Sequence, residues 1–315
     1  MHIQSSLKRL VILLALSFPF LSGCVEKQDR VFRVAILSGQ DGFTDIAKGF
    51  KTGMKDLGYI ENKNITYDIR KANNNPDLIF AFPTAMTAKR AAQRTDIPVV
   101  FALADMEVNK LIESLHRPGG NLSGVWFPGV EATGKRLEIL HEFMPGLKRV
   151  LITYDPSYPT ITKTLEELHS IAAMFRITLV EEPIKDLQEL DALLGKRTMS
   201  NHIDFEAVLI MPEVLTQSPE GWAMISRFAA YHRLPIAGDL CHTAKEGALF
   251  AYAPDLSETG MLAAPIADKV LKVVPAGKIM VATPNCRLWL NQSVAKGLGL
   301  EVSKALLGRA DEIIL

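Results

Sequence analysis

Short apolar segments alternate with longer amphipathic segments along most of this chain. The segments 31–37 (VFRVAIL) and 97–103 (IPVVFAL) are typical of strands that are buried on both faces. After the first of them comes a segment with helical spacing, which places Ile46 and Phe50 on one face and ends at Gly58. Because strands that alternate with helices form parallel sheets covered by helices on both faces, the pattern predicts an α/β fold.

The strand–helix series occurs twice. In the second series, 148–154 (KRVLITY) and 205–211 (FEAVLIM) are predicted strands, and Ser218 followed by Pro219 is a typical helix start. We therefore expect two Rossmann-like lobes with parallel sheets, joined by a hinge. The expected parts are residues 31–123 plus about 254–280 for the N-terminal lobe, 124–250 plus about 281–315 for the C-terminal lobe, and hinge segments near 121–127, 249–254 and 279–287.

The stretch RPGGNLSG (117–124) stands where the first series ends. A glycine-rich phosphate loop follows a strand and opens a helix. This stretch instead follows a predicted helix over about 108–115. Gly119 and Gly120 can supply the positive φ angles of a helix end, so we interpret the stretch as a hinge turn between the lobes.

The N-terminus has the features of a secretory signal. Lys8 and Arg9 precede an apolar run over 10–21 that is too short to span a membrane, and Leu-Ser-Gly-Cys24 follows. These four residues resemble the lipobox of bacterial lipoproteins, which implies cleavage before Cys24 and acylation of its thiol. We expect a signal peptide over 1–23, a tether over 24–30, and lipid anchoring in the cell envelope, at the periplasmic face or the cell surface.

Charge and cysteine content limit the partners. Two of the 35 basic residues and none of the 35 acidic residues precede Cys24, so the formal charge after cleavage is −2. Without a basic stripe the sequence predicts no nucleic-acid binding. Cys241 and Cys286 could form a disulfide in an oxidising compartment or remain buried free thiols.

No pattern in the sequence predicts an enzyme. GxSxG, HExxH and Walker motifs are absent from the sequence. Cys241 and His242, with Asp239 and Glu246 nearby, match no common zinc spacing. We expect neither a metal nor a cofactor.

The order of several segments resembles a known family. These are GFKTGMKDLGYIENKNITYDIR, IPVVF, SLHRPGGNLSGV, KRLEIL, RLPIAG, EGALFAYAPD, AAPIADKVLK, LWLNQSVAKGLGL and RADEII. Together with the lipobox they resemble the substrate-binding lipoproteins of ABC transporters, a group that includes tryptophan-binding proteins. The resemblance implies a type I periplasmic-binding-protein fold, capture of a small solute such as an amino acid or similar carboxylate, and a permease and an ATPase as partners. We expect a monomer. An orphan or sensory binding protein, or a paralogue that no longer binds, are the alternatives.

Ligands of open parallel sheets bind beyond the carboxyl ends of the strands. The residues predicted there are Ser38, Gln40, Thr84, Ala85, Asp105, Tyr154, Asp155, Glu213 and Asp239, with Ala104 and Pro212 beside them. Thr84 opens a helix, where free N–H groups attract a carboxylate, or it only caps that helix. The acids Asp155, Glu213 and Asp239 could bind an ammonium group or be solvated loop acids.

The sequence departs from the family in two places. Asp105-Met106-Glu107 stands where the family usually has Asp-Pro-Val, and only KANNNP separates Arg70 from Asp77. A parallel crossover needs a dozen or more residues, whereas these six reach about 20 Å at full extension. We infer that the second helix of the N-terminal lobe is deleted. This predicts an uncovered patch on one sheet face or a displaced second strand, and it brings ligand binding into question.

Overall fold

The computed structural model describes residues 30–39, 43–69, 76–82, 85–92, 95–104, 111–200 and 203–315. Residues Val31–Leu315 form one compact unit, to which both β-sheets belong. The expected signal peptide and Cys24 lie outside the described residues. Within the described ranges, no helix is both long enough and apolar enough to cross a membrane.

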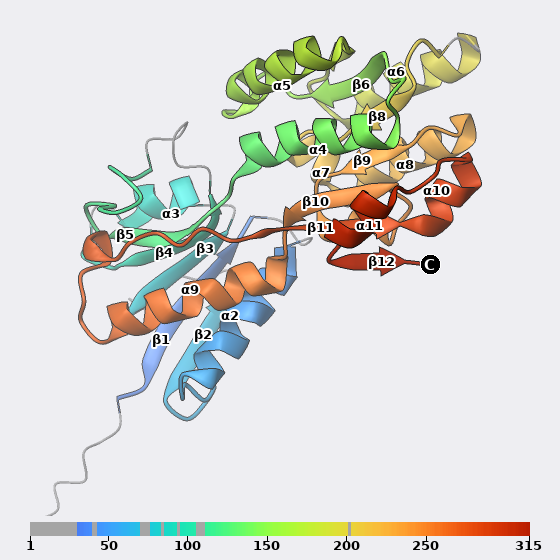
Figure 1. Cartoon of the computed structure of the whole chain (residues 1–315). Helices are drawn as coiled ribbons and strands as arrows, with labels where there is room; N and C mark the ends of the chain where they lie inside the picture. The colour runs from blue at the N-terminus through green and yellow to red at the C-terminus, as the bar shows by residue number, and fades with distance from the viewer. Residues whose placement is uncertain are drawn as a thin grey trace, which may run out of the picture. The chain divides into compact units, whose positions relative to one another are not determined.

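Five parallel strands form the first sheet in the order β2-β1-β3-β4-β5 (Figure 1). They are β1 (Phe32–Ser38), β2 (Ile65–Ile69), β3 (Leu78–Phe82), β4 (Val99–Ala104) and β5 (Leu122–Trp126). β3 and β4 are buried along their whole length, because helices cover both of their faces.

Helices α2 (Thr44–Asp56) and α9 (Leu256–Leu271) lie side by side on one face of this sheet (Figure 1). Glycines allow their close approach, since a Cβ atom on Gly49 would lie 1.9 Å from the backbone oxygen of Ser257. Beneath them Phe50 stacks on Phe80 with ring centroids 4.0 Å apart. Helix α3 (Ala85–Ala92) packs against β3 and β4 and belongs to the apolar cluster of the opposite face.

The short connection after β2 leaves the strand in place. β2 pairs with β1 in parallel register from Phe32 opposite Ile65 to Ile36 opposite Ile69, so the alternative of a displaced strand is wrong. On the face away from α2, Arg33 and Asp68 are exposed. The exposure of these two residues agrees with the expected uncovered patch. Both are charged, whereas a helix packed on this face would require apolar residues. Residues 70–75 of the connection lie outside the described residues.

The stretch RPGGNLSG differs from its interpretation. Gly119 and Gly120 have φ angles of 75° and 56°, as expected, but the described part of the predicted helix before them, 111–115, is not helical. The turn leads directly into β5, which pairs with β4 from Val99 opposite Leu122. It is therefore no phosphate loop, because it enters a strand and opens no helix. The glycine pair also lies one strand before the chain leaves the first sheet.

Seven strands form the second sheet in the order β12-β11-β10-β9-β8-β6-β7. They are β6 (Arg149–Tyr154), β7 (Thr178–Pro183), β8 (Ala207–Leu209), β9 (Ile236–Gly238), β10 (Phe250–Pro254), β11 (Cys286–Asn291) and β12 (Glu312–Ile314). All neighbours are parallel except β10 and β11. β11 and β12 therefore run in the direction opposite to the other five strands, and the chain enters β11 after it has crossed to α9 in the first lobe.

Helices cover both faces of the second sheet. The helices are α4 (Gly129–Phe143), α5 (Ile161–Phe175), α6 (Leu187–Ser200), α7 (Val214–Gln217), α8 (Pro219–His232), α10 (Gln292–Leu298) and α11 (Lys304–Arg309), with short 3-10 turns η2 (Cys241–Ala244) and, near the first sheet, η3 (Ala276–Lys278). α4 and α5 share one apolar cluster with the sheet, and α6 and α8 share the other. The structure confirms the α/β class and the two lobes. Cys241 and Cys286 are free thiols.

Candidate ligand-binding site

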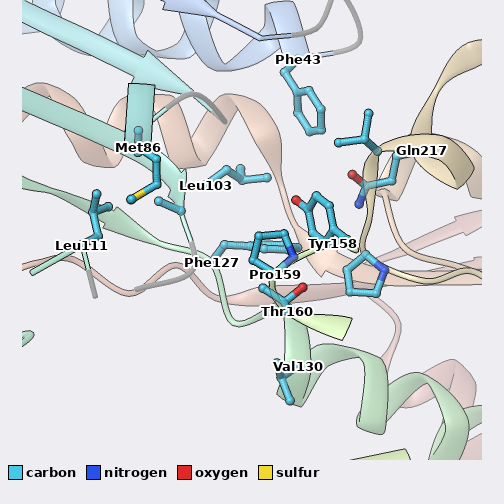
Figure 2. A pocket seen from close by; sticks show the side chains of 15 residues that line it. Phe43, Met86, Leu103, Leu111, Phe127, Val130, Tyr158, Pro159, Thr160 and Gln217 are labelled. Carbon is cyan, nitrogen blue, oxygen red and sulfur yellow. The ribbon is translucent and has the colours of Figure 1, made fainter. Parts of the chain in front are cut away.

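A pocket of about 210 Å³ lies at the carboxyl ends of strands from both sheets (Figure 2). Its walls come from the ends of β4, β5 and β8 and from the starts of several helices. The lining residues are Phe43, Ala85, Met86, Leu103, Ala104, Leu111, Phe127, Gly129, Val130, Tyr158, Pro159, Thr160, Pro212, Val214 and Gln217. This is the position at which open parallel sheets bind ligands.

The described lining is apolar and aromatic. Phe43, Phe127 and Tyr158 contribute rings, and Met86 and Leu103 contribute long aliphatic side chains (Figure 2). No charged side chain occurs among the described lining residues. A pocket of this kind binds an apolar group by burial and orients it with a few polar atoms.

Three long helices begin at the pocket without a side-chain cap: α2 in the first lobe, which starts after Phe43, and α4 and α5 in the second lobe. α4 starts after Pro128 and α5 after Thr160, and neither residue accepts a hydrogen bond through its side chain. Helices α8, α9, α10 and α11 are each capped, by Ser218, Asp255, Asn291 and Ser303 in that order. The first N–H groups of a helix have no partner within the helix, and with the helix dipole they attract an anion. The starts of α4 and α5 are therefore suited to a carboxylate.

Thr160 adds an unpartnered hydroxyl group to this wall. The residue is only 8% exposed, and its Oγ1 is shielded from solvent without a hydrogen-bond partner among the described residues. One turn further along α5, the hydroxyl of Thr164 donates to the Thr160 carbonyl at 3.0 Å. A buried hydroxyl without a partner is unfavourable, so a ligand group that pairs with it is favoured.

Leu103 reaches the pocket through a break in the regularity of β4. The pairing with β5 shifts between Phe101 and Ala104, and Leu103 has a φ of 52°, which is rare for a bulky residue. In a regular strand Leu103 would lie on the face of Phe101. The bulge places it instead in the apolar cluster of the opposite face, where it also lines the pocket. Strained backbone of this kind is concentrated at functional sites.

A buried polar network lies behind Gln217. The amide Nε2 of Gln217 donates to Oδ2 of Asp239, which is 1% exposed. Arg136 of α4 is also fully buried and donates to Thr133 Oγ1 at 2.7 Å and to the Ile210 carbonyl at 3.2 Å. Burial raises the pKa of Asp239, and the positive charge of Arg136 opposes that rise. The network thus contains a buried acid that holds a pocket-lining amide and a buried guanidinium whose charge acts on that acid.

Glu213 fixes the short helix that carries Gln217. Its two carboxylate oxygens accept hydrogen bonds from the backbone N–H groups of Leu215 at 2.7 Å and Thr216 at 2.8 Å. Burial raises the pKa of Glu213, and these hydrogen bonds oppose the rise. Its carboxylate is committed to capping α7.

The predicted site residues fall into three groups. Ala85 lines the pocket, and so do Ala104 and Pro212, which the sequence placed beside the predicted site residues. Gln40, Thr84 and Asp105 lie outside the described residues. The remaining five, Ser38, Tyr154, Asp155, Glu213 and Asp239, are not among the described lining residues.

Four of these five have partners within their own lobe, and those of Glu213 and Asp239 are described above. The Tyr154 hydroxyl donates to Glu181 at 3.1 Å, and Asp155 accepts from the Ser157 N–H at 2.8 Å. A ligand contact of any of the five stays a prediction.

The strand-end rule missed Tyr158, Thr160, Phe127 and Gln217. After β6 a turn over 155–158 separates the strand from α5, so the pocket wall begins several residues later than the rule places it. The sequence marked Thr160 only as a helix start, and because threonine is a preferred cap residue, its missing cap hydrogen bond is visible only in the structure. Gln217 lies on a one-turn helix that the sequence did not predict.

Comparison with known proteins establishes the class. The sequence profile of the family described as ABC transporter substrate binding protein matches residues 32–314, so the chain belongs to this family of solute-binding proteins. Members of the family are binding proteins and not enzymes, and they act in the cell envelope outside the cytoplasm. This confirms the predictions that the chain is not an enzyme and that it acts in the cell envelope. A tyrosine-binding protein of Clostridioides difficile (strain R20291) is 26% identical over 276 residues, which cover 81% of this chain and 76% of that protein.

Solved structures share the fold. The ABC domain from Streptococcus pneumonia in complex with L-Trp has a TM-score of 0.77 and 19% identity, and the match covers 90% of this chain and all of that one. A conserved domain protein from Vibrio cholerae has the same TM-score and coverage with 21% identity. The chain has the type I periplasmic-binding-protein fold, as predicted.

Proposed function

We propose that this chain is the lipid-anchored solute-binding component of an ABC importer and that it captures an amino acid with an apolar, aromatic side chain. The observation that carries the proposal is the pocket: two uncapped helix starts and the unpartnered Thr160 hydroxyl on a wall that otherwise carries rings and aliphatic groups. The named ligands of the relatives, tyrosine and L-Trp, support the same class.

The polar end of the ligand is assigned to the second lobe. A carboxylate at the starts of α4 and α5 would accept hydrogen bonds from backbone N–H groups and from Thr160. Rotation of the threonine side chain about χ1 moves the hydroxyl to another staggered position, so the hydroxyl can turn toward the ligand.

The side chain of the ligand is assigned to the first lobe. Met86, Leu103 and Leu111 line the pocket from that lobe, and Phe43 and Phe127 add two rings. Aromatic groups bury a large area against such a wall and gain from offset or edge-to-face ring contacts. A sugar would leave its hydroxyl groups without partners there, which disfavours it.

The remaining parts of the proposal follow from the organisation of the chain. Residues 31–123 plus about 254–280 and residues 124–250 plus about 281–315 form lobes that close on the ligand by bending where the chain passes between the sheets. These passages follow Trp126, Pro254 and Ala282. Cleavage before Cys24 and acylation of its thiol would hold the monomer at the membrane beside a permease and an ATPase.

A thermal-shift screen of residues 26–315 tests the ligand class. A ligand at 100 times its Kd stabilises the folded state by about 2.7 kcal/mol, and for domains of about 150–250 residues each kcal/mol raises the midpoint by roughly 2–4 °C. We expect shifts with L-tyrosine, L-tryptophan or L-phenylalanine and none with tyramine, which lacks the carboxylate, or with hexoses. A cooperative melt that no amino acid shifts would contradict the proposal.

A further inference from the structure

Gln217 presents one polar atom to the pocket from a rigid support. It ends the one-turn helix α7, which Glu213 caps with both carboxylate oxygens and which the Thr216 hydroxyl ties to the Met211 carbonyl at 2.9 Å. Gln217 lines the pocket, and Figure 2 shows its amide on the side where Tyr158 lies. Its position is therefore set before any ligand arrives.

The orientation of the Gln217 amide follows from its partner. An ionised carboxylate can only accept hydrogen bonds, so the amide must turn its NH₂ group toward Asp239. The carbonyl oxygen Oε1 is then the atom left for the pocket, and no described residue donates a hydrogen bond to it. The pocket thus holds a hydrogen-bond acceptor, and a flipped amide would lose the bond to Asp239.

The charge of Arg136 acts on Asp239 in the direction of the carboxylate, the form that fixes this orientation, while burial acts in the opposite direction. A guanidinium stays protonated in proteins, and a buried one requires a nearby negative charge. Asp239 is the acid whose charge acts most strongly on Arg136, and both side chains are buried. The charge of Arg136 in turn favours the carboxylate form of Asp239 against its burial.

The acceptor lies close to the site assigned to the carboxylate. Gln217 follows β8 and Thr160 follows β6, and these strands are paired neighbours in the second sheet. Neighbouring strands are about 4.8 Å apart, so the two loops form one corner of the pocket. The ammonium and carboxylate groups of an amino acid are bonded to the same carbon and must bind in one corner. The aliphatic side chains from the first lobe are then left for the remainder of the ligand.

We propose that Gln217 Oε1 accepts a hydrogen bond from the ammonium group of the bound amino acid, and that Asp239 and Arg136 act as positioning residues for it. This inference rests on the proposed function and adds the residue that distinguishes an amino acid from a plain carboxylic acid. A neutral amide would then bind the cationic group of the ligand, in a pocket whose described lining residues include no charged side chain.

Paired ligands that differ only in the ammonium group test the proposal by isothermal titration. The pairs are L-tyrosine with 3-(4-hydroxyphenyl)propionate and L-tryptophan with indole-3-propionate. Gln217→Met removes the acceptor and keeps the length of the side chain. We expect the variant to bind the amino acids about 10- to 100-fold more weakly, the range for a hydrogen bond to a charged group, and to bind the deamino acids as the wild type does.

Asp239→Asn tests the positioning role. An asparagine can accept or donate, so the Gln217 amide is no longer held in one orientation, and the preference for the amino acid over its deamino partner should fall. Because this change also removes the acid whose charge acts most strongly on Arg136, the double variant Arg136→Met, Asp239→Asn is measured beside it, with thermal unfolding as the check on folding. Adding Gln217→Met to the double variant should cause little further loss.

The outcomes separate the two proposals. If the wild type binds an amino acid and Gln217→Met weakens both members of a pair equally, the inference is overturned while the proposed function stands. If Gln217→Met weakens tyrosine but not phenylalanine, the acceptor binds the ring hydroxyl and the inference is also overturned. If the wild type binds none of the amino acids, both proposals fail.

Discussion

Thr160→Val removes one hydroxyl group from the pocket wall and keeps the shape of the side chain. The hydroxyl is buried without a partner in the described structure, and it makes no capping hydrogen bond at the start of α5. An unsatisfied buried polar group costs about 1–3 kcal/mol. We therefore expect the variant to unfold at a higher temperature, by at least the roughly 2–4 °C that corresponds to 1 kcal/mol.

Ligand binding should change in the opposite direction. A hydrogen bond to a charged group contributes about 1.5–3 kcal/mol, so losing the bond to a bound carboxylate weakens affinity about 10- to 100-fold. Calorimetric melting measures the first effect, and isothermal titration with L-tyrosine or L-tryptophan measures the second. A protein that becomes more stable and binds less tightly is the signature of a polar group reserved for the ligand.

Thr164→Val is the matched control on the same helix. Its hydroxyl is also buried but already donates to the Thr160 carbonyl at 3.0 Å, and it does not line the pocket. Loss of that bond should lower the free energy of unfolding by about 0.5–1.5 kcal/mol and leave affinity unchanged. A Thr160→Val variant that behaves like this control, less stable and equally able to bind, would refute the reasoning.

Four further predictions concern stability, thiol reactivity and anchoring. Gly49→Ala should lower the free energy of unfolding by about 1–3 kcal/mol or more, because its Cβ would overlap the backbone of α9. Gly195→Ala, which has free space around the new Cβ, should instead raise it by about 0.5–1 kcal/mol. Urea denaturation measures both changes. Burial raises the pKa of Cys241 to about 12 and that of Cys286 to about 11, so alkylation near pH 8.5 should be slow until urea is added, as mass spectrometry can show. Because the native thiols hold their protons above the pKa of the unfolded thiols, the free energy of unfolding should fall as the pH rises from about 9 to 11. Cys24→Ser should move the protein from the membrane fraction to the soluble fraction and abolish incorporation of labelled fatty acid; continued membrane association would count against the anchor.

Local signals in the sequence predicted most elements of the fold. The buried strands and the glycine after α2 were sufficient, and the predicted cap at Ser218 is confirmed by its hydrogen bond from the Gly221 N–H at 3.0 Å. The antiparallel β11 was not predictable from its own residues. Its direction depends on where the chain re-enters the second sheet from the first lobe, which is a long-range property.

The pocket was predictable in location but not in detail. The rule for strand ends found Ala85, Ala104 and Pro212, because these residues follow their strands directly. The bulge at Leu103 carries no glycine or asparagine to indicate a positive φ, so the pairing with β5 must determine it. Arg136, Gln217 and Asp239 are far apart in the sequence, and only folding brings their side chains into one network.

The position of α9 has a consequence for the order in which this protein matures. The helix lies between β10 and β11 in the sequence, yet it covers the first sheet. It packs closely on α2, because glycines at the contact leave no room for side chains between the two helices. When the first five strands have emerged from the ribosome or the export channel, the apolar face over Val34, Phe80 and Val100 still lacks this cover. That face stays open until residue 271 follows, about 145 residues after β5 ends. The first lobe can therefore complete its folding only after the second passage between the lobes, when most of the second lobe has also been made, and its sheet face is exposed to aggregation until then.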